Sequence, residues 1–317
     1  MHPYRRHPLI PGLLLVDKPT GPTSHDIVGR GRRVLGTRRV GHAGTLDPLA
    51  SGLLVLGVER GTKLLGHLAL KDKSYLATIR LGQATTTDDA QGDVVSSTDA
   101  TAVGDDALAA GIAALTGDLM QVPSSVSAIK VDGKRAYDLV RSGATVTLAA
   151  RPVTVSRFDV LAIRRGAEVG TDTGGGPTGT RVVDVDVMVD CTTGTYIRAL
   201  ARDLGTALGV GAHLTALRRT RIGPFGVGGA LDLWSMGADD RDTAHAAILP
   251  APRAAELSFP IRRASADEAR DLSYGRPLAA AGINGTYAVL DTAGELLALL
   301  AEDGERAKPV LVWHAAS

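Results

Sequence analysis

The sequence is poor in cysteine and has no long apolar run, and each shortage excludes a class of protein. A single cysteine, Cys191, excludes an internal disulfide and a cysteine-based zinc cluster, as expected in a reducing compartment. We expect its thiol to be a small core or edge residue. The longest apolar runs, such as GLLVLGV and LALLA, fall far below the roughly 18 residues of a membrane span. No signal-peptide pattern opens the sequence. We therefore expect a cytoplasmic protein with no membrane role.

Motifs that bind nucleotides or metals are also missing. The sequence has no P-loop, no His-Glu-x-x-His pair, no Gly-x-Ser-x-Gly elbow and no Cys/His spacing typical of zinc. Asp88, Asp89 and Asp93 do not fit the spacing of a calcium loop, so solvated loop acids are the favoured interpretation of them. The sequence therefore favours chemistry by side chains alone, with no cofactor and no metal.

Charge is segregated along the chain although its net charge is only +1. Residues 1–80 hold 13 Lys or Arg against 5 acids, whereas residues 81–120 hold 7 Asp and no basic residue. Residues 196–221 add five Arg against one Asp. Two separated basic segments predict a face that binds a phosphate backbone. Solvated surface charge without a partner remains the alternative. The length of 317 residues allows about two domains.

Periodicity predicts a mixture of helices and strands. In TSHDIVGRGRRVLG the apolar spacing predicts a helix with Ser24 as N-cap and Gly36 at its end. SYLATIRLG and VVDVDVMVD alternate and predict strands, the second with Val183, Val185, Val187 and Val189 facing inward. The pattern indicates an antiparallel sheet with one solvated face.

The period changes to that of a helix within GTYIRALARDLGTALG, which places Tyr196 and Arg198 at a strand-to-helix junction. Such a junction aims side chains into a cleft. The Gly/Thr-rich segment near 164–180 is predicted to be a loop without chemistry of its own. LPAPRAAELSFP resembles a linker, and the short runs after it predict a small β-rich module.

Asp47 has two compatible interpretations. Asp followed by Pro48 is typical of a helix start, with Asp as N-cap and Pro at the first helical position. A carboxylate held rigidly at a turn is also a well-placed nucleophile. Taken alone, His42 is more often a packed or surface residue than a catalytic one, and Tyr75 is more often half-buried sheet packing.

Several segments resemble a known family, in the same order along the chain. GHAGTLDPLASGLLVLG is similar to the catalytic-aspartate motif of the TruB family of tRNA pseudouridine synthases. LLLVDKPTGPTSHD, KSYLATIRLGQATTTDDAQGD, AIKVDGKRAYDLVRSG, CTTGTYIRALARDLG and GAHLTALRRTRIGPF also match. The resemblance covers about residues 10–227, and the tail is similar to a PUA RNA-binding module.

The resemblance implies an α+β fold. It consists of a pseudouridine synthase domain over residues 1–250, with a mixed, mostly antiparallel central sheet and flanking helices, and a β-rich PUA-like domain over residues 251–317. It implies isomerisation of the uridine at position 55 in the TΨC loop of tRNA, after that base has been flipped out. The expected partner is the T-arm stem-loop of tRNA, with no obligate protein partner, no membrane and a monomeric enzyme.

The resemblance also implies roles for individual residues. Asp47 attacks the ribose C1′ or abstracts a proton on the way to a glycal, and both routes stay open. Arg198 pairs with Asp47, since a cation within about 4 to 6 Å favours the charged carboxylate. Tyr75 stacks on the uracil and is a candidate for handling the C5 proton. The remaining matches are His42, which fills the gap left by the base, Tyr196 and Leu217 in the pocket, and Lys18 and Lys63 as supporting or RNA-contacting residues.

Residues 121–151 correspond to the RNA-binding thumb of the family. Family members usually carry an aromatic residue where this chain has Val126, which removes a stacking contact at that point.

Two other functions compete with pseudouridine synthesis. One is RNA binding or RNA folding assistance with secondary isomerase activity. The other is glycosidase activity, for which no second acid is convincingly placed beside Asp47.

Overall fold

The computed structural model describes residues 9–124, 130–131, 134–135, 148–170 and 179–314. The chain divides into two compact units. Unit 1 combines residues 1–46, 53–69 and 223–317, and unit 2 combines residues 47–52 and 70–222. Val126 and most of the predicted thumb lie outside the described residues.

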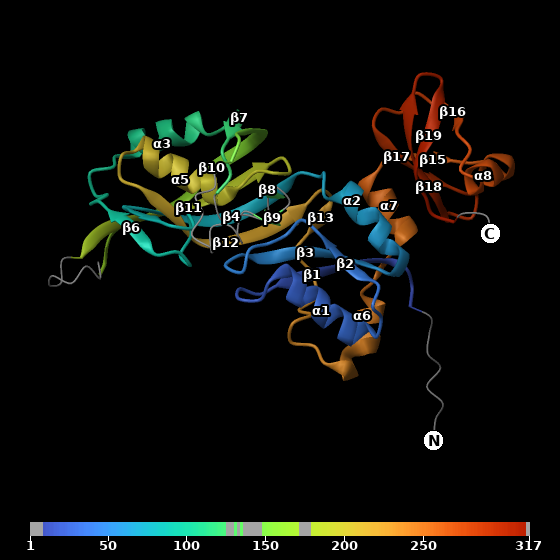
Figure 1. Ribbon diagram of the computed structural model, residues 1–317, viewed down its shortest axis with the longest axis horizontal. Coiled ribbons are helices and arrows are strands. Elements are labelled where there is room, and N and C mark those ends of the chain that lie inside the picture. The colour runs from blue at the N-terminus through green and yellow to red at the C-terminus, as the bar shows by residue number, and fades with distance from the viewer. Residues whose placement is uncertain (1–8, 125–129, 132–133, 136–147, 171–178, 315–317) are drawn as a thin grey trace. The chain divides into compact units, whose positions relative to one another are not determined.

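Unit 2 is built on an antiparallel sheet in the order β12-β4-β11-β10-β7 (Figure 1). Residues Ser51 and Gly52, which begin β3, add a short parallel pairing with β12. The sheet is therefore mixed and mostly antiparallel, as predicted. Its strands are β4 (Lys73–Leu81), β7 (Gly117–Gln121), β10 (Arg151–Val169), β11 (Thr180–Cys191) and β12 (Ala212–Ile222).

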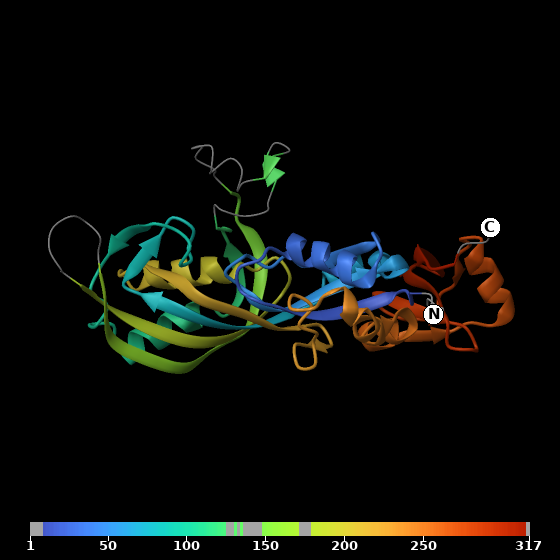
Figure 2. The same cartoon turned by 90° about the horizontal axis from the view of Figure 1, so that it is seen from below.

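Alternation decides which face of this sheet is buried. The four predicted valines of β11 have no exposed surface, and Val189 lies opposite Tyr75 of β4. The β10–β11 ladder contains three register shifts, and β-bulges of this kind bend a strand pair. Figure 2 shows the resulting curvature of the hairpin. β10 continues to Val169 and β11 begins at Thr180, so the two ends of the segment near 164–180 that was predicted as a loop are strand instead.

Two helices cover the buried face of unit 2, α3 (Asp105–Ala114) and α5 (Ile197–Ala207). Helix α5 follows β11 after a short turn, as the change of period predicts. Its Gly205 lies against the backbone of β12, because a Cβ there would be 2.2 Å from the Ala212 nitrogen. This close approach fixes the position of α5 on the sheet.

Unit 1 contains the sheet β14-β1-β3, with β2 paired to β3. Helix α1 packs its apolar side into the same core, which includes Leu14, Ile27 and Leu56. Thr23, and not the predicted Ser24, is the N-cap of α1, since the Thr23 hydroxyl accepts from the Asp26 amide. The Ser24 hydroxyl instead bonds the backbone of Leu46 in both directions. The elements are β1 (Gly12–Lys18), α1 (Ser24–Leu35), β2 (Val40–Ala43), β3 (Ser51–Val58) and β14 (Leu249–Pro250).

The prediction of a linker in LPAPRAAELSFP is wrong, because this segment folds into α7 (Ala251–Ser258). Alanines and Leu257 after a proline start a short helix more readily than an extended linker, and Ala251, Ala254 and Ala255 are buried. The β-rich module that follows is confirmed as a five-stranded sheet in the order β15-β17-β18-β19-β16. Its elements are β15 (Ile261–Arg263), α8 (Ala266–Ser273), β16 (Leu278–Ala279), β17 (Thr286–Leu290), β18 (Leu296–Asp303) and β19 (Arg306–Val312).

Within the described ranges, none of the helices has the length and apolar character needed to cross a bilayer.

The remaining elements are short. These elements are η1 (Glu59–Leu64), α2 (Leu65–Leu68), β5 (Gln83–Thr85), β6 (Val94–Ser97), β8 (Lys130–Val131), β9 (Lys134–Arg135), β13 (Phe225–Gly226), η2 (Ala238–Asp240) and α6 (Arg241–Ala246).

Gly205→Ala is expected to lower the free energy of unfolding by about 1 to 3 kcal/mol, because the added methyl group meets backbone that cannot move aside. Gly29→Ala is the matched control in α1, where the added carbon meets no heavy atom within 4 Å outside the backbone of the helix itself. That change should stabilise the protein by about 0.5 to 1 kcal/mol. Thermal unfolding measures both, and a Gly205→Ala protein as stable as the wild type would contradict the close packing.

Candidate active site

Asp47 lies in a turn of unit 2 that aims its carboxylate at Arg198. The Ala50 amide donates to the Asp47 carbonyl at 3.1 Å, and no helix follows, so the helix-start interpretation of Asp47 is wrong. Arg198 Nε donates to Asp47 Oδ2 at 3.0 Å. The Asp47 side chain is 41% exposed, whereas that of Arg198 is 5% exposed. The carboxylate thus reaches solvent while the cation that holds it is buried.

Arg198 has further partners besides Asp47. Its NH1 donates to the Thr87 carbonyl at 2.8 Å, and its Nε lies 3.7 Å from Asp89 Oδ2. Asp89 is 5% exposed, and its Oδ1 accepts from the Thr87 hydroxyl at 2.6 Å and the Gln91 amide at 3.0 Å. A guanidinium bonded to fixed acceptors on two sides keeps one orientation. Arg198 is therefore already oriented toward Asp47.

The interpretation of Asp89 as a solvated loop acid is wrong. The loop after β5 folds back onto β12, where the Ala90 amide donates to the Leu214 carbonyl at 2.8 Å. This pairing buries Asp89 beside Arg198. The local sequence does not predict the contact between Asp89 and Arg198, because the two residues are far apart in the chain. The apolar alternation of the strand that contains Leu214 is the signal from which the loop's docking partner could have been inferred.

Tyr75 and Arg219 form a cross-strand pair on the buried face of the sheet. Their exposed fractions are 7% and 1%. Burial raises the pKa of the Tyr75 hydroxyl. The charge of Arg219 and its hydrogen bond to Tyr75 lower this pKa in part, and the negative charge of Asp47 raises it. Tyr75 is therefore a neutral phenol at neutral pH, and it lies within electrostatic range of Asp47. Arg219 was not predicted, although the alternation of ALRRTRI turns it toward the same face as Leu217.

Leu217 and Lys73 extend this face on either side of the pair. Leu217 is buried and lies opposite Ala77 of β4. Lys73 is 5% exposed and donates to the Lys71 carbonyl at 2.9 Å. Burial lowers the pKa of the Lys73 amine to about 8, and the charge of Arg219 is the second cause. This face of the sheet is thus apolar at Leu217 and polar at Arg219 and Lys73.

Tyr196 occupies the N-cap position of α5, two residues before Arg198. Its side chain is half-buried, and its backbone is bonded to the side chain of Gln121. Asp47, Tyr75, Arg198, Tyr196 and Leu217 thus belong to one unit, and the structure brings the first three within contact or electrostatic range. Roles for these residues in catalysis stay predictions.

The other three predicted residues belong to unit 1. His42 is half-buried in β2, opposite Leu56. Lys18 is buried and donates to the carbonyls of Pro19 at 2.9 Å and Pro22 at 2.8 Å, which closes the turn before α1. Lys63 is exposed in η1 and donates to the Val312 carbonyl at 3.4 Å. Their assignment to the site stays a prediction.

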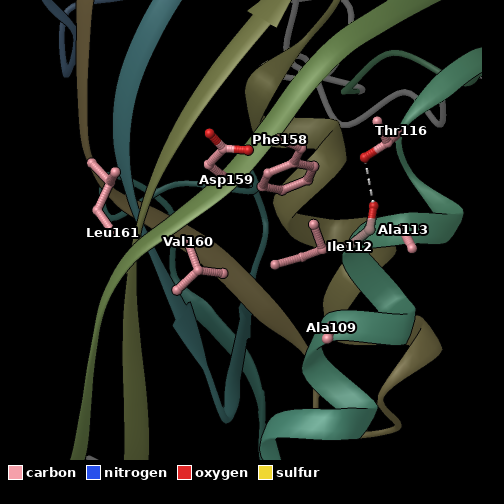
Figure 3. A pocket seen from close by; sticks show the side chains of 8 residues that line it. All are labelled: Ala109, Ile112, Ala113, Thr116, Phe158, Asp159, Val160 and Leu161. Carbon is pink, nitrogen blue, oxygen red and sulfur yellow. Dashed lines mark hydrogen bonds between the residues drawn. The ribbon is translucent and has the colours of Figure 1, made fainter.

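A separate hollow of unit 2 carries no comparable chemistry. It lies between α3 and β10, and Figure 3 shows Ile112, Phe158 and Val160 along its wall. The only charged group that lines it is Asp159, which pairs with Arg157 at its exposed surface. No group of three or more His, Cys, Asp or Glu that could hold a metal ion occurs in the described part of the chain.

Comparison with family models gives three matches that together cover most of the chain. Residues 32–197 match the model described as "TruB family pseudouridylate synthase (N terminal domain)". Residues 198–246 match "tRNA pseudouridylate synthase B C-terminal domain", and residues 259–314 match "tRNA Pseudouridine synthase II, C terminal".

Individual relatives and solved structures agree with these models. Proteins named tRNA pseudouridine synthase B from Rhodococcus jostii and Nocardia farcinica are each 56% identical to this chain, over 96% and 98% of it and 95% of their own lengths. A Cbf5-Nop10-Gar1 complex contains a chain with TM-score 0.70 and 26% identity, over 99% of this chain and 88% of that one. An H/ACA RNP bound to a substrate RNA containing 2'-deoxyuridine gives 0.68 and 25%, over 98% and 87%.

The lowered pKa of Lys73 predicts that stability depends on pH in a definite direction. An unfolded lysine has a pKa near 10.5, so between pH 8 and that value the unfolded chain binds more protons than the folded one. The free energy of unfolding contributed by Lys73 therefore rises with pH, by at most about 1.4 kcal/mol per unit. Cys191, whose pKa burial raises from 9.0 to about 11, acts oppositely above pH 9.

The measurement is denaturant unfolding of the wild type and of Lys73→Met from pH 8 to 9. The stability of the wild type should gain on that of Lys73→Met as the pH rises through this window. Parallel curves would show that the Lys73 amine titrates alike in the folded and unfolded states, against its burial in the structure.

Proposed function

The chain belongs to the TruB family of pseudouridylate synthases, and from this we propose that it isomerises one uridine of tRNA, at position 55 in the TΨC loop, to pseudouridine. The chain is an isomerase. The reaction breaks the bond between C1′ of the ribose and N1 of uracil and forms one between C1′ and C5, while C5 loses its proton and N1 gains one. It is an exchange of bonds within one nucleotide, so it has no net oxidation or reduction, and it consumes no second substrate.

The observation that carries the proposal is the contact between Asp47 and Arg198. A carboxylate that is 41% exposed is accessible to an incoming nucleotide, and the buried guanidinium bonded to its Oδ2 leaves Oδ1 for chemistry. Asp47 then either adds to C1′ or removes a proton on the way to a glycal. In both routes its negative charge is required, and the Arg198 guanidinium is bonded to Oδ2 at 3.0 Å.

Tyr75 and Leu217 supply a wall for the released base. The released uracil must stay bound while it rotates until C5, and no longer N1, faces the ribose C1′. An apolar, water-poor surface favours this retention. The neutral phenol of Tyr75 offers a ring for stacking, worth roughly 1 to 3 kcal/mol per base. Its oxygen is the proposed acceptor of the C5 proton: the phenol passes its own O–H proton to water, Arg219 stabilises the negative charge that develops on the oxygen, and the C5 proton then restores the phenol.

A target base inside a folded loop must leave its stack before it reaches Asp47, at a cost of a few kcal/mol. We assign His42 to the vacated space, and the exposed side chains of Lys63, Arg32 and Arg33 to the phosphate backbone. Lys18 supports the turn before α1. The proposal also assigns residues 1–250 to the synthase domain and residues 251–317 to a PUA-like domain. It further takes the enzyme to be a monomer of the cytoplasm.

A glycosidase remains the weaker alternative. Asp89 is a second carboxylate beside Arg198, but its side chain is 5% exposed and both its oxygens face protein donors. It therefore lacks the access to substrate that a general acid of a glycosidase requires. Its place is that of a partner for Arg198.

Asp47→Asn is expected to lower the single-turnover rate on a T-arm stem-loop by about 10³-fold or more, because the amide neither attacks C1′ nor accepts a proton. Affinity for the RNA should stay within about twofold, since the shape of the side chain is kept. Nucleoside-resolved detection of pseudouridine measures the first and filter binding the second.

Two controls accompany this experiment. Asp159→Asn makes the same chemical change at an exposed ion pair of unit 2 and should keep the wild-type rate. A stem-loop with cytidine at the target position should give no product. Full turnover by Asp47→Asn would refute the role of Asp47, and a wild type that binds but never converts the stem-loop would favour RNA folding assistance.

A further inference from the structure

Gln121, the last residue of β7, forms hydrogen bonds with the backbone just before Arg198. Its side-chain Nε2 donates to the Tyr196 carbonyl at 3.1 Å, and its Oε1 accepts from the Tyr196 amide at 2.8 Å. The side chain is 4% exposed. A primary amide presents a donor and an acceptor in one plane, as a peptide group does, so Gln121 binds Tyr196 as a neighbouring strand would. This fixes the chain two residues before Arg198.

The residue after Gln121 is bonded to the same helix, one turn further on. Arg202 NH2 donates to the Val122 carbonyl at 2.7 Å, and its NH1 donates to Asp88 Oδ2 at 3.4 Å. Residues 198 and 202 are four apart and so lie on one side of α5. The chain at 121–122 therefore contacts α5 immediately before Arg198 and again one turn after it.

Arg202 also holds the loop that supplies the partners of Arg198. Asp88 stands between Thr87, whose carbonyl accepts from Arg198, and Asp89, whose carboxylate faces Arg198. Its φ is 60°, a left-handed conformation that residues other than glycine adopt rarely. The contact with Arg202 helps to keep Asp88 in this conformation, which turns Thr87 and Asp89 toward the guanidinium.

We propose that Gln121 and Arg202 are positioning residues for the Asp47–Arg198 pair. Gln121 sets where α5 begins, and Arg202 sets where the loop of Thr87 and Asp89 lies, so that Arg198 is held from both flanks. Neither residue touches the carboxylate of Asp47. This inference rests on the proposed function of the pair and adds to it the part of the chain that keeps the pair aligned.

The expected effects are large because reaction geometry is sensitive to small shifts. A displacement of about 1 Å at a reacting group costs up to about 10²-fold in rate. Gln121→Met keeps the volume of the side chain and removes both hydrogen bonds to Tyr196. We expect it to lower the single-turnover rate on the T-arm stem-loop by about 10-fold or more, with affinity for the RNA unchanged within about twofold.

Gln121→Glu provides a second variant that retains a polar side chain. It keeps an acceptor for the Tyr196 amide but loses the donor for the Tyr196 carbonyl, so the rate should also fall. Met120→Leu is the control on the same strand, where the side chain is 66% exposed, and it should leave the rate unchanged. For Arg202→Met, which should also slow the reaction, the control is Arg157→Met, which removes an exposed ion pair of unit 2.

A double-mutant cycle separates positioning from general support of the fold. If Gln121 acts through Arg198, Gln121→Met should cost less than about twofold further in an Arg198→Lys background, because the group that it aligns is already impaired. A side chain that merely stabilises the fold would cost the same factor in both backgrounds, which would overturn the proposal.

The outcomes also distinguish this inference from the proposed function. A wild type that forms pseudouridine, together with a Gln121→Met variant that reacts at the wild-type rate, overturns the positioning role alone. A wild type that forms none on the stem-loop overturns the proposed function first.

Discussion

The structure of the site depends on one buried guanidinium placed between two carboxylates. Arg198 donates to Asp47 at 3.0 Å and lies 3.7 Å from Asp89, and only the first of these acids is open to solvent. A buried cation without partners would be costly, so Arg198 requires at least one acid nearby. Asp89, with the Thr87 carbonyl, meets that need from the buried side and leaves the Asp47 carboxylate open to solvent. The two acids therefore differ in exposure, and the proposed function gives the catalytic role to the exposed one, Asp47.

Each contact of Arg198 comes from a different part of unit 2. Helix α5 supplies the guanidinium, the turn before β3 supplies Asp47, and the loop after β5 supplies Thr87 and Asp89. Close packing of α5 on β12 at Gly205, and the pairing of the loop with Leu214, hold these pieces in register. The synthase sheet thus acts as a rigid support on which the acid and the cation meet.

The sequence predicts well the features that depend on local pattern. The alternating valines of β11 and the change of period before α5 give strand, helix and junction at the right residues, and family motifs single out Asp47 and Arg198. Asp89, Arg219 and Gln121 were missed because their contacts join segments distant in the chain, and Asp89 looks like any loop acid. Ser24 and Thr23 can both cap a helix, and the hydrogen bonds of Thr23 with Asp26 and of Ser24 with Leu46 decide between them. The linker failed because an alanine-rich stretch after a proline is also a helix.

The most direct test of the account is chemical rescue of Arg198→Ala by a small guanidinium compound. With methylguanidinium at constant ionic strength, the single-turnover rate on the T-arm stem-loop should recover part of what the variant has lost, because the ion can occupy the space beside Asp47. Tetramethylammonium, which has the charge but no N–H donors, should restore nothing. An Arg198→Ala protein that forms pseudouridine at the wild-type rate without any added cation would contradict the central role of the buried guanidinium.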